Sequence, residues 1–299
     1  MTWNPGPVVG YGETDTSCHY PTILHQGGMH MTESFFAADD IHLSFGGLTV
    51  LEGVGFTANE GEILGLIGPN GAGKSSLLNC VTGFYRNQRG TVSYRGQDIT
   101  HWPPHRVAKI GIGRTFQTEQ LCATLSVLEN MMIGRHMHMN SSVVEGLVYW
   151  GRARSEQIRE RERVEEIMDL LDLGHVRHEP VAMLPLGIRK RVDLGRAIVM
   201  EPSLVFLDEF SVGMNKDEKE DTVRFILDVY ELKGLTIVLV EHDMDIVTDI
   251  CQRLVVLDFG HKLAEGSTSE VVNNPEVIRA YLGVKRDADE TALNSAMGV

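Results

Sequence analysis

Short, nearly continuous apolar runs alternate with amphipathic stretches along most of the chain. The runs cover residues 62–67, 204–207, 235–240 and 254–257. Each has the length of a buried strand and falls well short of the ~18 residues that span a bilayer. Strands that are apolar on both faces and separated by helical segments are typical of a parallel sheet covered on both sides. The pattern therefore predicts an α/β fold.

A second pattern interrupts this alternation in the middle of the chain. From about residue 128 to 173, charged and helix-favouring residues come to dominate, and apolar residues such as Val164, Ile167 and Leu171 recur at helical spacing. We predict a helical subdomain at about 118–200 that is inserted into the α/β core.

The two ends of the chain differ from the rest. Residues 1–33 are rich in Gly, Pro, Thr and His and lack any periodicity, and residues 285–299 are small and polar. Such ends are usually poorly ordered. We expect a disordered leader at 1–33, one domain at 34–284, and a flexible tail at 285–299.

The composition of the chain excludes several classes of function. The 41 acidic residues outnumber the 27 basic ones, so the net charge of −14 argues against broad nucleic-acid binding. With no apolar run long enough to span a bilayer, membrane association would have to come through a partner. The first basic residue is Lys74, so no secretory signal is expected. The scattered cysteines indicate reduced thiols in a cytosolic protein, and they are Cys18, Cys80, Cys122 and Cys251.

Residues 68–75 read Gly-Pro-Asn-Gly-Ala-Gly-Lys-Ser and fit the pattern G-x-x-x-x-G-K-[ST] in full. Glycines let the backbone curl so that successive N–H groups point at phosphate oxygens, and the helix that follows adds its positive end. Lys74 can place a charge on the β- and γ-phosphates, and the Ser75 hydroxyl can bind Mg²⁺. A chance glycine-rich turn is the alternative, but the position between a predicted strand and a predicted helix favours a phosphate-binding loop.

Two of the predicted strands end in polar residues at the same edge of the sheet. One is followed by Asp208 and Glu209, and another leads to His242. Because neighbouring residues on a strand point to opposite sides, we expect Asp208 to face Mg²⁺ and Glu209 to activate the attacking water as a general base. His242 can donate a hydrogen bond to the γ-phosphate. The alternative is that the two acids merely end a strand and that the histidine has a structural role. The phosphate loop upstream favours the catalytic interpretation.

At this point the chain resembles the ATP-binding-cassette (ABC) ATPases over roughly residues 35–284. The motifs occur in the family's order: GPNGAGKSS (68–76, Walker A), GRTFQ (113–117, Q-loop), LPLGI (184–188, signature), LVFLDE (204–209, Walker B), SVGMN (211–215, D-loop) and VEHD (240–243, H-loop). The resemblance implies a P-loop NTPase fold with a RecA-like core, an antiparallel β subdomain and an inserted helical subdomain.

The resemblance also implies roles for individual residues. ATP would be bound by Phe45, Gly68, Pro69, Asn70, Gly71, Ala72, Gly73, Lys74, Ser75 and Ser76. Mg²⁺ would be held by Ser75, Gln117 and Asp208, and the catalytic residues would be Glu209, His242 and Gln117. Phe45 would stack on adenine, and a plain core aromatic is the alternative. Gln117 would also sense the membrane subunit.

Within the family, several phrases are similar to the ATPases that power import of branched-chain amino acids and related small polar solutes. They are FGGLTVLEGVGF (45–56), RTFQ followed by LSVLEN (125–130), RKRVDLGRA (189–197) and VIRAYLG (277–283). The partners implied are a second ABC ATPase in a hetero- or homodimer, transmembrane permease subunits and, indirectly, a solute-binding protein. The implied location is peripheral, on the cytoplasmic face of the inner membrane, and cytosolic when the protein is isolated.

The signature is the main departure from the family. In place of LSGGQ the chain has Leu184, Pro185, Leu186, Gly187 and Ile188. Pro185 has neither the serine hydroxyl that normally reaches the partner's ATP nor a backbone N–H. The LP-x-G form resembles the same importer subgroup, so activity is still expected. A non-transport or adaptor cassette, which binds ATP and dimerises with little turnover, is the alternative function.

A run of His and Met at 135–139 suggests a soft-metal site at first sight. However, His136 and His138 are two residues apart, which on a helix points them to different faces. We expect a helix or its end here.

Overall fold

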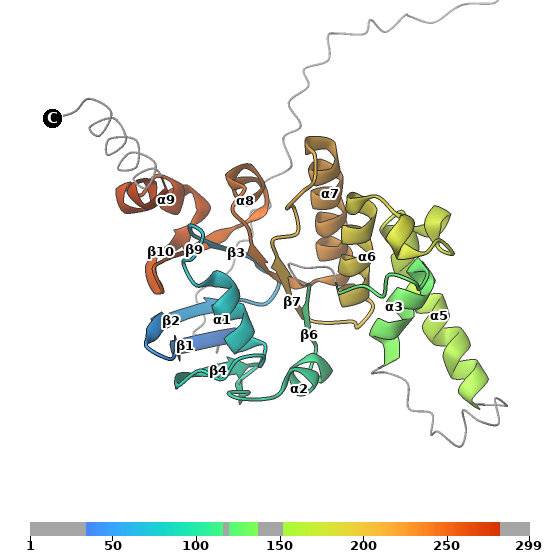
Figure 1. The fold of residues 1–299 in the computed structure, drawn as a ribbon, viewed down its shortest axis with the longest axis horizontal. Coiled ribbons are helices and arrows are strands. Elements are labelled where there is room, and N and C mark those ends of the chain that lie inside the picture. The colour runs from blue at the N-terminus through green and yellow to red at the C-terminus, as the bar shows by residue number, and fades with distance from the viewer. Residues whose placement is uncertain (1–33, 116–119, 137–151, 282–299) are drawn as a thin grey trace, which may run out of the picture. The chain divides into compact units, whose positions relative to one another are not determined.

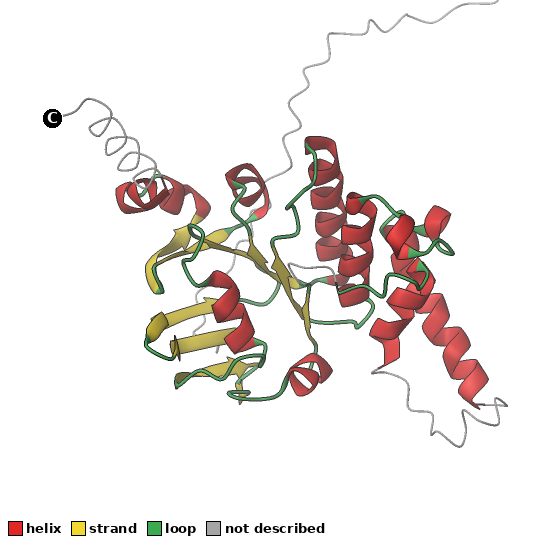
Figure 2. Cartoon of the chain, viewed as in Figure 1, coloured by secondary structure: helices red, strands yellow, loops and turns green. Residues whose placement is uncertain are grey.

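A computed structural model of the 299-residue chain describes residues 34–115, 120–136 and 152–281. These residues belong to one compact unit. Figure 1 shows its elements in chain order, and Figure 2 shows the strands in two groups, with a group of helices on one side of them. The predicted leader, tail and Gln117 lie outside the described residues, as does most of the His–Met run.

The strands are β1 (Phe36–Phe45), β2 (Leu48–Ala58), β3 (Ile63–Ile67), β4 (Arg89–Tyr94), β5 (Gln97–Asp98), β6 (Ile112–Arg114), β7 (Leu204–Asp208), β8 (Thr236–Val240), β9 (Arg253–Asp258) and β10 (His261–Ser267). The α-helices are α1 (Lys74–Val81), α2 (Pro104–Lys109), α3 (Val127–Arg135), α5 (Arg152–Leu170), α6 (Leu186–Ile198), α7 (Lys216–Lys233), α8 (Met244–Ile250) and α9 (Thr268–Val272). Two short 3₁₀ turns, η2 (Gly174–Val176) and η3 (Val181–Met183), precede α6.

The larger sheet has the strand order β10-β9-β3-β8-β7-β6. Neighbouring strands from β9 to β6 pair in parallel, and β10 is an antiparallel edge strand beside β9. Every residue of β3, β7 and β8 is buried, as their continuous apolar runs predicted. The expected parallel sheet is confirmed, and the carboxyl ends of β3, β7 and β8 meet at one edge.

Successive residues of the central strands pack on opposite faces of this sheet. Leu204 and Phe206 of β7 belong to a core shared with α1 and the four-stranded sheet, whereas Val205 and Leu207 face the core formed with α3 and α5 to α8. Both faces are therefore covered by apolar side chains, which is the arrangement that parallel sheets require.

The smaller sheet has the order β2-β1-β4-β5, and all of its pairs are antiparallel. The ring of Phe36 lies 5.6 Å from that of Phe56 in β2 and 5.5 Å from that of Phe206 in β7, so one aromatic side chain joins the two sheets. This sheet confirms the antiparallel β subdomain that the resemblance implied.

Between β6 and β7 the described chain is helical, and α3 and α5 lie on the side away from the four-stranded sheet (Figure 1). Ser126 begins α3 with a capping box that it shares with Glu129. Val164, Ile167 and Leu171 are buried, as their helical spacing predicted. None of the helices in the described ranges is both long and apolar enough to cross a bilayer.

Candidate active site

The glycine-rich loop joins β3 to α1 at the carboxyl edge of the large sheet. Gly68 has φ 151°, and a Cβ placed on it would lie 2.2 Å from the carbonyl oxygen of Leu257, so only glycine fits between the loop and β9. The turn after β9 also holds the loop, because the N–H of Gly260 donates to the carbonyl of Ala72 at 3.1 Å. The helix begins after Gly73, which has φ 100°.

Lys74 lies folded into this loop. Its Nζ donates to the carbonyl oxygens of Gly68 at 2.7 Å and Pro69 at 3.0 Å. Burial lowers the pKa of Lys74, and the nearby carboxylates, Glu209 first, oppose that shift in pKa. The cation is thus held at the centre of the loop, where it can meet phosphate oxygens. Around it, Asn70 and Gly71 are exposed at the tip, whereas Ser75 and Ser76 are partly buried on the first turn of α1.

Asp208, the last residue of β7, forms a buried ion pair with Arg114, the last residue of β6. Nη2 of Arg114 lies 2.9 Å from Oδ2 of Asp208. Nη1 of the same guanidinium donates to Oδ1 of Asn79 at 2.7 Å and to Oγ1 of Thr82 at 2.9 Å. Burial raises the pKa of Asp208, and Arg114 opposes this rise in pKa. Oδ1 of Asp208 has no hydrogen-bond partner among the described residues, so it is available to a ligand.

Glu209 corrects one prediction. We expected Asp208 and Glu209 to point to opposite sides as neighbours on a strand, but β7 ends at Asp208, and Glu209 has φ 50°. Its N–H donates to the carbonyl of Val240 at 2.8 Å, which fixes the turn against β8. Glu209 is therefore placed by a left-handed turn after the strand and not by the alternation of neighbours on a strand. Such a strained conformation in a non-glycine residue is common at functional sites.

His242 follows β8 and is half exposed, next to a carboxylate that the sequence analysis did not single out. Glu241 is completely buried, and its two oxygens accept hydrogen bonds from the backbone N–H and the hydroxyl of Ser211 at 2.9 and 3.0 Å. The N–H of His242 donates to Glu241 at 3.3 Å. Glu241 therefore connects the segment after Walker B to His242. The signal for it was an acid placed directly at the end of a buried strand.

Phe45 and the signature lie on different elements, at the end of β1 and at the start of α6. Phe45 at the end of β1 is 48% exposed, and its ring lies edge-on to Tyr85 at 5.3 Å, so it is not a core aromatic. Pro185 is the N-cap of α6, where a missing N–H costs little. Gly187 is buried, and a Cβ placed on it would lie 3.1 Å from the carboxylate of Glu218 on α7. The remaining signature side chains, Leu184, Leu186 and Ile188, are partly buried.

A family model described as "ABC transporter" matches residues 51–212. The chain belongs to the ABC transporter family. In this ABC ATPase a second model, described as "Branched-chain amino acid ATP-binding cassette transporter", matches residues 261–287.

The ABC ATPase is similar to curated proteins over most of its length. The high-affinity branched-chain amino acid transport ATP-binding protein LivG of Salmonella typhimurium is 34% identical over 253 residues, which cover 85% of this chain and 99% of that protein. BraF of Pseudomonas aeruginosa, which has the same description, is 31% identical over 85% of this chain and 99% of that protein. A crystal structure of a nucleotide-free ATP-binding cassette from an ABC transporter is 32% identical, with a TM-score of 0.73 over 83% of this chain and 99% of that one. The predicted cassette fold and an ATP-hydrolysing transport subunit are confirmed.

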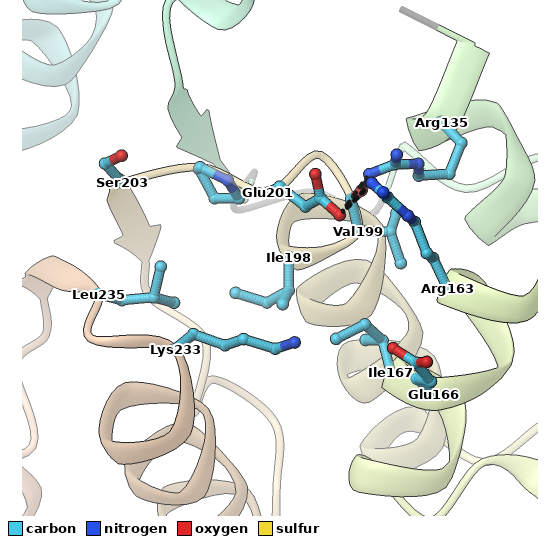
Figure 3. Close-up of a pocket in the computed structure, with 11 residues that line it drawn as sticks. Arg135, Arg163, Glu166, Ile167, Ile198, Val199, Glu201, Ser203, Lys233 and Leu235 are labelled. Atoms are coloured by element: carbon cyan, nitrogen blue, oxygen red, sulfur yellow. Dashed lines mark hydrogen bonds and ion pairs between the residues drawn. The ribbon is translucent and has the colours of Figure 1, made fainter. Parts of the chain in front are cut away.

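A cavity of about 260 Å³ lies at the other end of β7 in this ABC ATPase (Figure 3). It is lined by Arg135, Arg163, Glu166, Ile167, Ile198, Val199, Glu201, Pro202, Ser203, Lys233 and Leu235. Arg135 and Arg163 both contact the carboxylate of Glu201, at 3.3 and 2.8 Å. Ser203 precedes β7, so at roughly 3.3 Å per residue the cavity lies about 16 Å along the strand from Asp208. It is separate from the nucleotide motifs.

The His–Met run begins at the end of a helix, as expected, and its residues 137–139 lie outside the described residues. Arg135 is the last residue of α3, and His136 is its C-cap. Within the described parts of this ABC ATPase, no group of three His, Cys, Asp or Glu residues is arranged to hold a metal ion.

Proposed function

We propose that this ABC ATPase powers an importer of branched-chain amino acids or related small polar solutes. Two observations support the substrate class. The relatives of Salmonella and Pseudomonas are described as branched-chain amino acid transport proteins, and they align with 85% of the chain. In addition, the C-terminal residues 261–287 match the family model specific to such cassettes. The match outside the nucleotide motifs carries the proposal, because those motifs are shared by ABC ATPases of every substrate.

We assign the parts of hydrolysis to this chain's own residues. Lys74 and the N–H groups of the loop bind the β- and γ-phosphates, and Phe45 stacks on adenine, which is worth about 1–3 kcal/mol. Glu209 takes the proton of the attacking water, and His242 donates a hydrogen bond to the γ-phosphate. Gln117 completes this set in our proposal and connects it to the membrane subunit.

We further propose that Mg²⁺ accompanies ATP. The residues present fit this ion: Asp208 offers a buried carboxylate oxygen that has no other partner in the described structure, and Ser75 offers a hydroxyl on the first turn of α1. Oxygen ligands of this kind are those that Mg²⁺ prefers. When bound, the ion would neutralise developing phosphate charge.

We propose that the domain spans residues 34–284 with its helical subdomain at about 118–200. It would act as a peripheral protein on the cytoplasmic face of the inner membrane. Its partners would be a second ABC ATPase, transmembrane permease subunits and, indirectly, a solute-binding protein. No nucleic acid takes part in this scheme.

The altered signature predicts an asymmetric pair of ATPases. The family sandwiches each ATP between one subunit's Walker A motif and the other's signature. A homodimer of this chain would lack the serine contact in both sandwiches. A hydrogen bond to a charged group is worth about 1.5–3 kcal/mol, or about 10- to 100-fold in a rate or equilibrium. A partner with a complete LSGGQ-like motif would restore the sandwich that uses Lys74, Glu209 and His242. The other sandwich would pair the partner's Walker A with Pro185 and stay impaired.

Two experiments test these proposals. In vesicles that contain the permease and both ATPases, uptake of radiolabelled leucine should require ATP and should be lost in Lys74→Ala. ATP turnover without any uptake, or a chain that binds ATP and dimerises but does not hydrolyse it, would favour the adaptor function. For the asymmetry, the catalytic Glu of each subunit is replaced separately. Loss of Glu209 should stop nearly all turnover and loss of the partner's Glu much less; equal losses would contradict the asymmetry.

A further inference from the structure

Arg114 lies where three parts of the nucleotide site meet. It ends β6, directly before the segment that contains Gln117. Its guanidinium contacts Asp208 at the end of β7, and also Asn79 of the loop helix α1 and Thr82, the C-cap of that helix. The guanidinium also lies 5.7 Å from the ring centre of Phe84. Arginine presents several donors in a rigid plane, so a single side chain can hold fixed positions on more than one element.

We propose that Arg114 is a positioning residue that sets both the orientation of the Asp208 carboxylate and its spacing from Ser75, the two oxygen ligands of the Mg²⁺ site. This inference rests on the proposed magnesium site. It concerns a residue to which neither the sequence motifs nor the comparisons assign a role.

The first reason is the orientation of the carboxylate. Arg114 engages Oδ2 of Asp208, which leaves Oδ1 as the buried oxygen without a partner among the described residues. The neighbouring Thr115 fixes the backbone of the same residue, because its Oγ1 accepts from the N–H of Asp208 at 3.2 Å. Two consecutive residues at the end of β6 thus hold Asp208 at two points. With Oδ2 engaged by Arg114, Oδ1 is the carboxylate oxygen that remains for a ligand.

The second reason is the spacing between the ligands. Ser75 and Asn79 on α1 and Thr82, the C-cap of that helix, are separated by four and three residues and so lie along one side of it. Arg114 donates to Asn79 and Thr82 through the same nitrogen, Nη1, while Nη2 holds Asp208. The side of α1 that bears Ser75 is therefore tied to the end of β7 through one planar group. Partners behind a metal ligand typically contribute 10- to 100-fold to metal affinity.

The test separates position from charge. The full-length protein is saturated with ADP, which prevents turnover, and titrated with Mn²⁺ as a spectroscopic substitute for Mg²⁺, with free Mn²⁺ followed by electron paramagnetic resonance. Arg114→Lys keeps the charge but offers a single nitrogen, which cannot take the positions of both Nη1 and Nη2. Arg114→Met removes both charge and bridge. Arg95→Met is the control, because Arg95 pairs with exposed Glu60 at a distant surface.

We expect about a tenfold increase in the half-saturating Mn²⁺ concentration for both Arg114 variants, and no change for the control. ADP binding in EDTA should stay within about twofold of the parent. Loss of a cation alone would strengthen Mn²⁺ binding, so tighter binding by Arg114→Met with parent-like binding by Arg114→Lys would overturn the proposal. A parallel loss of metal-free ADP binding would also overturn it, since that would indicate a purely structural role.

The same titration separates this inference from the metal site on which it rests. If the parent protein with ADP bound no Mn²⁺, the magnesium proposal itself would fail. Asn79→Ala provides a second variant that leaves the Arg114–Asp208 pair in place and loosens only its link to α1. We expect a smaller increase in half-saturating Mn²⁺ than for Arg114→Lys. A parent-like Asn79→Ala would contradict the role of Arg114 in spacing.

Discussion

A buried arginine in an ion pair lies near each end of β7. The two ion pairs differ in how many of their polar atoms have hydrogen-bond partners. At the carboxyl end, Arg114 holds one oxygen of Asp208 and leaves the other buried without a partner in the described structure. Beyond the amino end, Arg135 is 1% exposed and is held by the carboxylates of Glu160 and Glu201 and by the carbonyl of Val199. Its buried nitrogen atoms all have partners.

This difference distinguishes a buried ion pair that serves function from one that serves stability. A polar group buried without a partner is costly, so it persists where a ligand will satisfy it. A network that is satisfied on all sides instead makes the packing specific. Arg135 joins α3, α5 and the turn before β7, and Figure 3 shows it beside Glu201. We therefore assign Arg135 a structural role. We assign Arg114 and Asp208 to the nucleotide site. Substitutions at the two ends should therefore separate activity from stability.

The largest effect is expected at the carboxyl end. Glu209→Gln should lower single-turnover ATP hydrolysis by about 100- to 10,000-fold, because it removes the general base and little else. ATP affinity should be retained, and the free energy of unfolding should stay within about 0.5 kcal/mol. Rapid-quench hydrolysis and urea denaturation measure the two quantities. Hydrolysis at the parent rate would refute the assignment of Glu209.

At the amino end the effect should be on stability instead. Arg135→Met leaves Glu160 buried without its partner and should lower the free energy of unfolding by about 3–5 kcal/mol. Arg163→Met is the matched control: Arg163 contacts the same Glu201 but is half exposed, so its loss should cost less than about 1 kcal/mol. Hydrolysis per folded molecule should be unchanged in both. If the two variants lost equal stability, the network would not have the structural role inferred for it.

Ser211→Ala is an intermediate case, since Glu241 is buried but lies beside His242. Loss of one of its hydrogen bonds should cost about 1–3 kcal/mol at neutral pH. Burial raises the pKa of Glu241 above its unfolded value, and the Ser211 hydrogen bonds oppose this rise in pKa. The bonds are strongest to the ionised carboxylate, so the cost should shrink as the pH falls through that raised pKa, which lies above the ordinary value of about 4.3. Exposed Ser269→Ala should show no such pH dependence in the same denaturation series.

The smallest effect is expected for a partly exposed pair. Nζ of Lys219 lies 2.6 Å from Oδ2 of Asp243, the residue that follows His242 in the sequence. The hydrogen bond from Lys219 lowers the pKa of Asp243, so the pair stabilises the fold above the unfolded pKa of about 3.9 and is lost as the pH falls below it. Lys219→Met should cost less than about 1 kcal/mol at pH 7 and still less near pH 4. A cost that grew on acidification would contradict this sign.

Contiguous features of the sequence predicted most of the fold. Apolar runs gave the buried strands β3, β7, β8 and β9, because a strand covered on both faces tolerates few polar residues. The spacing of Val164, Ile167 and Leu171 indicated the face of α5 and its end that enters the core. The phosphate loop was also predictable, since its glycines and lysine lie within eight residues.

Contacts between distant segments were not predictable. Arg114 and Asp208 are 94 residues apart, and Ser211 and Glu241 are 30 apart. Neither pair shows a local pattern, because each depends on how strands align in the sheet. The left-handed turn at Glu209 was missed for another reason: residues other than glycine seldom adopt φ near 50°, so the sequence around Glu209 favoured a continued strand.

The position of β3 has a consequence for synthesis of the protein. β3 precedes the phosphate loop but lies between β8 and β9 in the sheet. The loop itself packs closely against Leu257 and accepts a hydrogen bond from Gly260. Both of its neighbours in the sheet leave the ribosome long after it does. During translation the five residues of β3, which are all buried in the folded protein, stay exposed until their partner strands have been made, and this exposure favours aggregation of the nascent chain. A ribosome-bound chain that stops before Arg253 should therefore retain no ATP, and nucleotide capture would report that synthesis has passed the last strands of the sheet.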